Sequence, residues 1–138
     1  MDHRVKATCI VAGTATGPLL LSAEPLSFWG GYDPKTGEII DRRHPLSGQS
    51  AAGTVLALPF TRGSSTSTAI LLESVRAGFA PSAILSTAVD PFLALASIVA
   101  RELYDANLPI LVITKEQMAG LTTGVIAQIE QDGTLSWG

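Results

Sequence analysis

Hydrophobic and polar residues form short blocks along this chain, and the blocks predict β-rich ends and an α/β middle. Near the N-terminus, apolar stretches that end at glycine or polar residues predict strands at 5–12 and 18–22. In the middle, continuous apolar runs at 54–59, 83–86 and 108–113 are typical of strands buried on both faces. The middle of the chain is therefore expected to supply the centre of a sheet.

Helices are predicted between these central strands. Apolar residues recur at helical spacing over 65–77, and Gly78 is the expected stop. A second helix is predicted over 91–107, entered through Asp90 as its N-cap and Pro91 at its first position. The resulting β-α-β-α-β order is typical of parallel strands joined by helical crossovers.

The C-terminal part of the chain predicts a short helix and then a hairpin. Thr114 and Gln117 have the spacing of a capping box, which marks a helix start. The dipeptide Asp132-Gly133 is a strong hairpin turn between two apolar segments. The predicted hairpin strands are residues 125–129 and 134–137. The expected fold is one α/β domain over 1–138, with central parallel strands, helices and an antiparallel β layer.

Residues 24–53 break this regular pattern. The segment has five glycines, three prolines and few aliphatic residues. A long irregular loop inside a compact domain is uncommon and is often functional or part of an interaction surface. Phe28 to Gly31 are therefore candidates to pack against a partner or to line a shared cleft, with core packing as the alternative.

Composition and charge narrow the function. The chain has 138 residues, of which 46% are hydrophobic and 15% charged, and its net charge is −3. This balance argues against nucleic-acid binding, which usually relies on a basic surface. The single cysteine, Cys9, can form neither an internal disulfide nor a CxxC site, which fits a reducing cytoplasm. We expect no leader peptide, no membrane span and no metal held by this chain alone.

The most unusual stretch is a run of five hydroxyl residues, Ser64 to Thr68, directly after Arg62-Gly63. It lies where a buried strand is expected to give way to a helix, which is where open α/β folds bind ligands. A helix N-terminus offers free N–H groups and partial positive charge, and Arg62 adds a guanidinium that suits a carboxylate or phosphate. Gly63 would let the backbone approach a ligand closely. The sequence therefore predicts an anion-facing site with candidate hydroxyl bases.

Three other interpretations of the run remain open. It could be an ordinary N-cap followed by a solvated turn. It could be a phosphate loop, although the lysine of the Walker pattern is missing. The domain could also be an anion-binding or phosphocarrier module, although neither His3 nor His44 lies near the Gly63 turn in sequence and both are expected to face solvent.

Two separated motifs carry a resemblance to a known family. The stretch "EPLSFWGGYDPKTGEIIDRRHPLSGQSAAGTVLALPFTRGSSTST", residues 24–68, contains a Pro-Leu-Ser-Phe-x-Gly-Gly-x-Asp-Pro segment, a His-Pro-Leu loop and an Arg-Gly-Ser helix start. At this spacing the chain resembles the swivelling domain of the aconitase X family over nearly its whole length. The resemblance implies a swivelling β/β/α domain, either fused to a large catalytic domain or made as a separate small subunit.

The resemblance also implies a chemistry. Members of the family are hydro-lyases that dehydrate cis-3-hydroxy-L-proline or mevalonate 5-phosphate, with an iron or iron–sulfur centre held by cysteines of the large part. The serine after (Lys/Arg)-Gly is the family's proton acceptor, which here is Ser64, and Arg62, Gly63 and Ser65 are the expected substrate-binding residues. The expected assembly is a heterodimer with a large subunit, inactive without it, and cis-3-hydroxy-L-proline is the favoured substrate.

Overall fold

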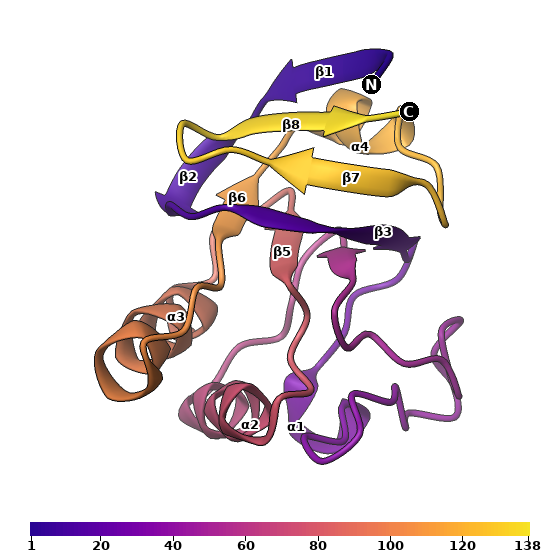
Figure 1. The fold of residues 1–138 in the computed structure, drawn as a ribbon. Helices are drawn as coiled ribbons and strands as arrows, with labels where there is room; N and C mark the ends of the chain where they lie inside the picture. Colours follow the sequence, from indigo (N-terminus) through magenta and orange to yellow (C-terminus); the bar gives the residue numbers. More distant parts are fainter.

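The chain forms one curled eight-stranded sheet with two helices against its lower face (Figure 1). The computed structural model describes residues 1–138. The strands are β1 His3–Lys6, β2 Thr8–Val11, β3 Ala15–Leu21, β4 Val55–Ala57, β5 Ala83–Ser86, β6 Ile110–Val112, β7 Ile126–Ile129 and β8 Thr134–Trp137. The helices are α1 Phe28–Gly31, α2 Ser65–Ala77, α3 Pro91–Tyr104 and α4 Lys115–Ala119. No helix combines the length and apolar character needed to cross a membrane.

The centre of the sheet is parallel and its flanks are antiparallel. The strand order is β1-β8-β7-β3-β4-β5-β6-β2, and β3, β4, β5 and β6 are parallel to one another. Every residue of β4 and β5 is buried, as their continuous apolar runs predict. The α/β prediction, with parallel central strands and an antiparallel layer, is confirmed.

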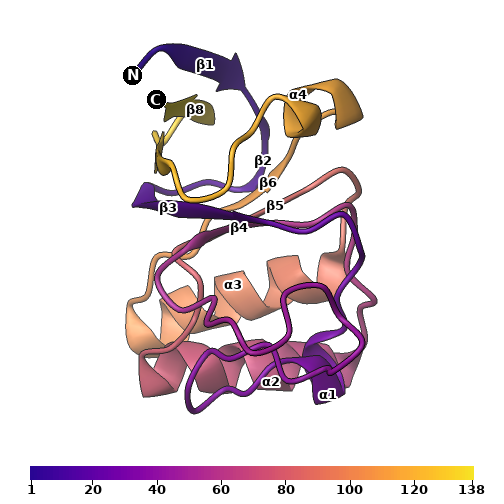
Figure 2. The same ribbon diagram turned by 90° about the vertical axis from the view of Figure 1, so that its right-hand side faces the viewer.

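The predicted N-terminal strand at 5–12 is wrong in one respect, because it is divided at Ala7. β1 pairs with β8, whereas β2 pairs with β6 at the opposite edge of the sheet. The N–H of Ala7 donates to the carbonyl oxygen of Gly133 at 2.9 Å. The sheet therefore curls so that one residue, Ala7, joins its two edge strands. β1, β7 and β8 form an upper layer in Figure 1, and Figure 2 shows β1 and β8 above β3.

The alternation of side chains along the central strands creates two cores. One face of the parallel strands packs on α2 and α3, and the other packs on the β7–β8 hairpin inside the curl. In β4, Leu56 belongs to the helical core, while Val55 and Ala57 belong to the core inside the curl. Such two-sided burial is why these strands are apolar at every position.

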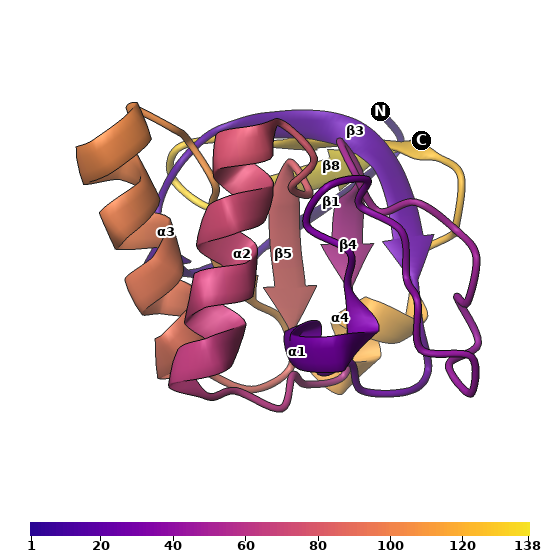
Figure 3. The ribbon, with the colours of Figure 1, turned by 90° about the horizontal axis from the view of Figure 1, so that it is seen from below.

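The helix boundaries follow their capping residues. α2 ends at Ala77, and Gly78 is its C-cap. The φ of Gly78 is 86°, in the left-handed region that glycine adopts without strain. α3 begins after Asp90 as predicted but ends at Tyr104 rather than at residue 107, because Asp105 takes a left-handed conformation with φ of 52°. Thr114 and Gln117 form the predicted capping box of α4. Figure 3 shows α2 and α3 side by side beneath the sheet, with α1 next to α2.

The irregular segment 24–53 is well packed. Phe28 and Tyr32 are buried with ring centroids 5.1 Å apart, and the Tyr32 hydroxyl donates to the carbonyl oxygen of Phe79 at 2.7 Å. Burial raises the pKa of the Tyr32 phenol. Trp29, by contrast, is 63% exposed. Of the two interpretations of this stretch, core packing therefore holds for Phe28, whereas Trp29 lies on the surface and is available to a partner or a shared cleft.

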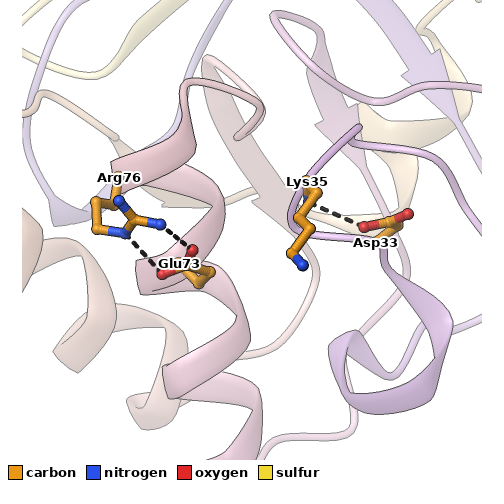
Figure 4. Close-up of polar contacts among 4 residues, drawn as sticks. All are labelled: Asp33, Lys35, Glu73 and Arg76. Carbon is orange, nitrogen blue, oxygen red and sulfur yellow. Dashed lines mark hydrogen bonds and ion pairs between the residues drawn. The ribbon is translucent and has the colours of Figure 1, made fainter.

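The turn at residues 33–37 lies beside α2 (Figure 4). The Asp33 carboxylate accepts the N–H of Lys35 at 2.9 Å. On α2, Arg76 forms a two-pronged ion pair with Glu73. The pKa of Glu73 is lowered, chiefly by hydrogen bonding from Arg76 and to a smaller extent by the positive charges of Arg76 and Lys35. The charge of Lys35 therefore lies near Glu73 of α2, although the two side chains form no ion pair.

Gly133 accepts the hydrogen bond from Ala7, the residue that joins the two edge strands, and its replacement tests the contact between the two residues. Its φ is 93°, and an added Cβ would lie 2.7 Å from the Ala7 carbonyl oxygen and 2.9 Å from Cys9 Sγ. We expect Gly133→Ala to lower the free energy of unfolding by about 2–4 kcal/mol, from backbone strain plus overpacking, measured by urea denaturation. Gly124→Ala is the matched control, because Gly124 has φ of 89° but no atom near its Cβ position. Equal losses in the two variants would contradict a contact at the junction.

Candidate active site

Two loops leave neighbouring strands and bring two helix N-termini together. β4 leads through residues 58–64 into α2, and β5 leads through residues 87–90 into α3. The loops are hydrogen-bonded to each other, since the N–H of Thr87 donates to the carbonyl oxygen of Pro59 at 3.1 Å. Both helices begin at the edge toward which the arrows of β4 and β5 point in Figure 3. The predicted location, at the carboxyl ends of parallel strands, matches the sites of open α/β folds.

Ser64 is the N-cap of α2. Its backbone is extended, with φ of −159° and ψ of 170°, and its Oγ accepts the N–H of Ser67 at 3.3 Å. The N–H groups of Ser65 and Thr66 donate to no atom of the chain. The half-buried Ser64 hydroxyl therefore lies beside two free N–H groups at the positive end of a helix.

The remaining hydroxyls of the run have different environments. Ser67 is buried and its Oγ donates to the carbonyl oxygen of Arg62 at 3.3 Å. Thr68 Oγ1 donates to the carbonyl oxygen of Phe92 on α3 at 2.9 Å. Ser65 and Thr66 are exposed. Two hydroxyls thus hold the helix start against its surroundings, one caps it, and two are free to meet a ligand.

Gly63 lies against a carboxylate of the same chain. A Cβ at this position would be 2.5 Å from Oδ2 and 2.7 Å from Cγ of Asp90. Its φ lies outside the left-handed region, so the backbone itself does not require glycine. The sequence suggested that Gly63 leaves room for a ligand, but the space at its Cβ position is occupied by the Asp90 carboxylate.

Arg62 is exposed and faces an open polar cavity of about 470 Å³. Its N–H donates to the carbonyl oxygen of Leu26 at 3.1 Å, which ties the loop to the irregular segment. The other residues lining the cavity are Glu24, Pro25, Ser27, Asp41, Arg43, His44 and Pro45. None of its four charged side chains forms an ion pair, because the ion pairs of the chain are Lys6–Asp132 and Glu73–Arg76. Two acidic and two basic side chains, none of them in an ion pair, therefore line the same cavity.

His44 is buried, so the expectation that it faces solvent is wrong. It is 7% exposed; its Nδ1 accepts the N–H of Leu46 at 3.1 Å, and its Nε2 is 3.4 Å from Ser22 Oγ. Both ring nitrogens are thus engaged within the chain, which disfavours a phosphohistidine carrier. His3 lies far from the turn and stacks on Trp137 with ring centroids 5.3 Å apart. Sequence reasoning missed the burial of His44, because that burial depends on how the loop around it folds.

Sequence reasoning also missed the position of Asp90 beside Gly63, having assigned Asp90 only as a helix cap. The signal available was its place in the loop that follows one central strand, since Arg62 lies in the loop that follows the preceding central strand. The turn holds no cysteine, and both oxygens of its one carboxylate, Asp90, accept hydrogen bonds from Thr61 and Phe92, so the turn does not suit an iron–sulfur centre. Nowhere in the chain do three or more His, Cys, Asp or Glu side chains converge as a metal-ligand group.

Comparisons with known proteins identify the family. The family model described as Aconitase X swivel domain matches residues 4–137. The chain belongs to this family. A cis-3-hydroxy-L-proline dehydratase of Pseudomonas aeruginosa is 50% identical over 108 residues, and one of Hypocrea jecorina is 41% identical over 112. The aligned parts cover 78% and 81% of this chain, and the chain spans 19% of the length of each relative.

Relatives of similar length are also found. The phosphomevalonate dehydratase small subunit of Methanothermobacter thermautotrophicus is 37% identical over 117 residues, which cover 85% of each chain. The crystal structure of aconitase X from Thermococcus kodakaraensis in its holo-form matches with a TM-score of 0.85 and 27% identity, over 99% of both chains. The swivelling-domain fold expected from the sequence is therefore confirmed.

The capping role of Ser64 can be measured without any activity. Ser64→Ala removes the acceptor for the Ser67 N–H, so we expect a loss of about 1 kcal/mol in the free energy of unfolding. Ser65→Ala is the matched control, because Ser65 is an exposed neighbour whose hydroxyl makes no hydrogen bond in the chain, and we expect a change within about 0.5 kcal/mol. Denaturant titration of the two variants tests this order, and a larger loss at Ser65 would contradict it.

Proposed function

We propose that this chain is the small subunit of an aconitase X-type hydro-lyase and that Ser64 is the base of a site shared with a large subunit. The observation that carries the proposal is the position of Ser64, in a family member, at a helix N-terminus between two free N–H groups and the Arg62 loop. A neutral serine hydroxyl is a very weak base; the effective base is the deprotonated oxygen, and neighbouring positive charge and free N–H groups favour that form.

The chain's residues suit the first half of a dehydration. A base removes the proton from the carbon beside the carboxylate, the electron pair of that C–H bond forms the double bond, and the C–O bond on the next carbon breaks. The departing hydroxide becomes water by taking up one proton, which restores the base. The deprotonated Ser64 oxygen takes the proton and becomes a hydroxyl, while the N–H groups of Ser65 and Thr66 and the guanidinium of Arg62 stabilise negative charge on the substrate. Ser65 can also hydrogen-bond a substrate oxygen. An iron or iron–sulfur centre in the large subunit would supply a Lewis acid for the leaving hydroxyl.

Two features support a large partner. One relative of matching length is named a small subunit, and the relatives named cis-3-hydroxy-L-proline dehydratase are about five times longer than the part that matches this chain. The second feature is an exposed aromatic side chain near the open cavity at Arg62: Trp29 is exposed, and it lies two residues after Ser27, which lines that cavity. We therefore propose a heterodimer in the cytoplasm, with no activity in this chain alone.

The charges around the cavity favour cis-3-hydroxy-L-proline as the substrate. This amino acid is a zwitterion, with a carboxylate that suits Arg62 or Arg43 and an ammonium group that suits Glu24 or Asp41. The second candidate, mevalonate 5-phosphate, is supported by the relative that matches this chain in length. It carries a phosphate and a carboxylate but no cation, so two acidic residues at the cavity would disfavour it. Lys35, another possible phosphate ligand, lies near Glu73 instead.

Reconstitution tests the function directly. The purified chain, its large subunit and the pair should each be assayed on both substrates under conditions that preserve iron. We expect turnover of cis-3-hydroxy-L-proline by the pair alone. Turnover of mevalonate 5-phosphate in its place would establish the second candidate, and turnover of either substrate by the chain alone would end the subunit proposal.

Ser64→Ala separates the catalytic role from the capping role. A general base contributes on the order of 10²–10⁴-fold, so kcat of the assembled pair should fall by that factor with KM little changed. Ser65→Ala should leave most of kcat. A Ser64→Ala pair with normal turnover and a lowered melting temperature would reduce Ser64 to a cap, and equal losses at both serines would indicate a shared anion cradle without a single base.

A further inference from the structure

The carboxylate of Asp90 connects the two loops at the candidate site. Asp90 is the N-cap of α3, and its Oδ1 accepts the N–H of Phe92 at 2.9 Å. Its other oxygen, Oδ2, accepts a short hydrogen bond from the hydroxyl of Thr61 in the loop before α2. The side chain is only 8% exposed. One carboxylate therefore caps one helix and holds the loop that leads into the other.

The contact with Gly63 is a second and independent link. The Asp90 carboxylate fills the space that a Cβ on residue 63 would need, whereas the backbone conformation of Gly63 would accept alanine. Glycine at this position is thus explained by Asp90 and not by its dihedral angles. Thr61 and Gly63 flank Arg62 and precede Ser64, so both links act on the proposed site residues.

Capping alone does not explain this arrangement. An N-cap needs one oxygen, and serine, threonine or asparagine would provide it equally well. Asp90 uses its second oxygen on Thr61 and its bulk on Gly63. From the other side, the loop is held by the bridge between Leu26 and Thr61 and by the bond from the Arg62 N–H to Leu26. The turn is therefore clamped between the irregular segment and Asp90.

We propose that Asp90 is a positioning residue for the reaction, which holds the Thr61–Gly63 segment so that Arg62 and Ser64 meet the substrate at the required distance. The kinetic part of this inference rests on the proposed function of Ser64. The clamp itself is a property of the isolated chain and is tested separately.

The clamp is tested by a double-mutant cycle in thermal unfolding. Gly63→Ala should lower the melting temperature by roughly 5–10 °C, because the new methyl group collides with the Asp90 carboxylate. In an Asp90→Ala background, which removes the three atoms nearest to the added Cβ, the same change should cost less than roughly 2 °C. Additive effects of Gly63→Ala and Asp90→Ala would overturn the proposal, whatever the chain's activity.

The positioning role is tested by two further variants in the reconstituted pair. Asp90→Ser keeps a capping oxygen but cannot reach Thr61, so its melting temperature should stay within roughly 3 °C of the wild type while kcat falls about 10²-fold. Asp90→Asn keeps the cap, the shape and a polar contact with the Thr61 hydroxyl, so kcat should stay within about 5-fold of the wild type. Asp105→Asn, at the far end of the same helix, is the matched control and should change nothing.

Each outcome decides between roles. Normal turnover by Asp90→Ser would reduce Asp90 to a helix cap and overturn the proposal. A loss in Asp90→Asn as large as in Asp90→Ser would assign the carboxylate charge to the chemistry, which also overturns positioning. An inactive wild-type pair would refute the proposed function instead, and the melting cycle would still decide whether Asp90 clamps the turn.

Discussion

The parallel pairing of β4 with β5 is the constraint on which the candidate site depends. It places the ends of two buried strands next to each other, so the loops that follow must lie side by side and both helices must start at the same edge. The polar groups there are not assembled by a flexible surface. They are fixed by backbone hydrogen bonds of a sheet whose central residues are fully buried, which is the rigid support that a catalytic constellation needs.

The five hydroxyls illustrate how one local sequence can serve several purposes. Serine and threonine weaken a helix interior, because their side chains compete for backbone hydrogen bonds. At a helix start the same tendency is useful: Ser64 caps, and Ser67 and Thr68 bond backbone carbonyl groups of Arg62 and Phe92. The cost in helix propensity is offset by a rigid first turn, and the exposed hydroxyls are left available.

Sequence reasoning succeeded where the determinants are local. The limits of α2 follow from Ser64 and Gly78, and the start of α3 follows from Asp90 and Pro91, because caps act within a few residues. It failed where partners are distant in the chain. The break at Ala7 depends on Gly133, and the burial of His44 depends on Ser22 and Leu46, so neither could be found from periodicity. The place of Ser64 at the start of α2 was predicted from local signals, and its role as a base is a proposal; the contact between Asp90 and Gly63 depends on two loops that are distant in the sequence.

The proposed base places a condition on the rest of the enzyme. A serine hydroxyl gives up its own proton, and so becomes an effective base, only where positive charge is close and unscreened, and water would screen both the helix N-terminus and Arg62. In this chain the charge is present, but Arg62 is exposed and its cavity is open. Exclusion of water must therefore come from the surface that covers the cavity. On this argument the proposed large subunit would have a role besides supplying a metal centre: by closing over Arg62 it would favour the basic form of Ser64, so that binding and activation would be the same event.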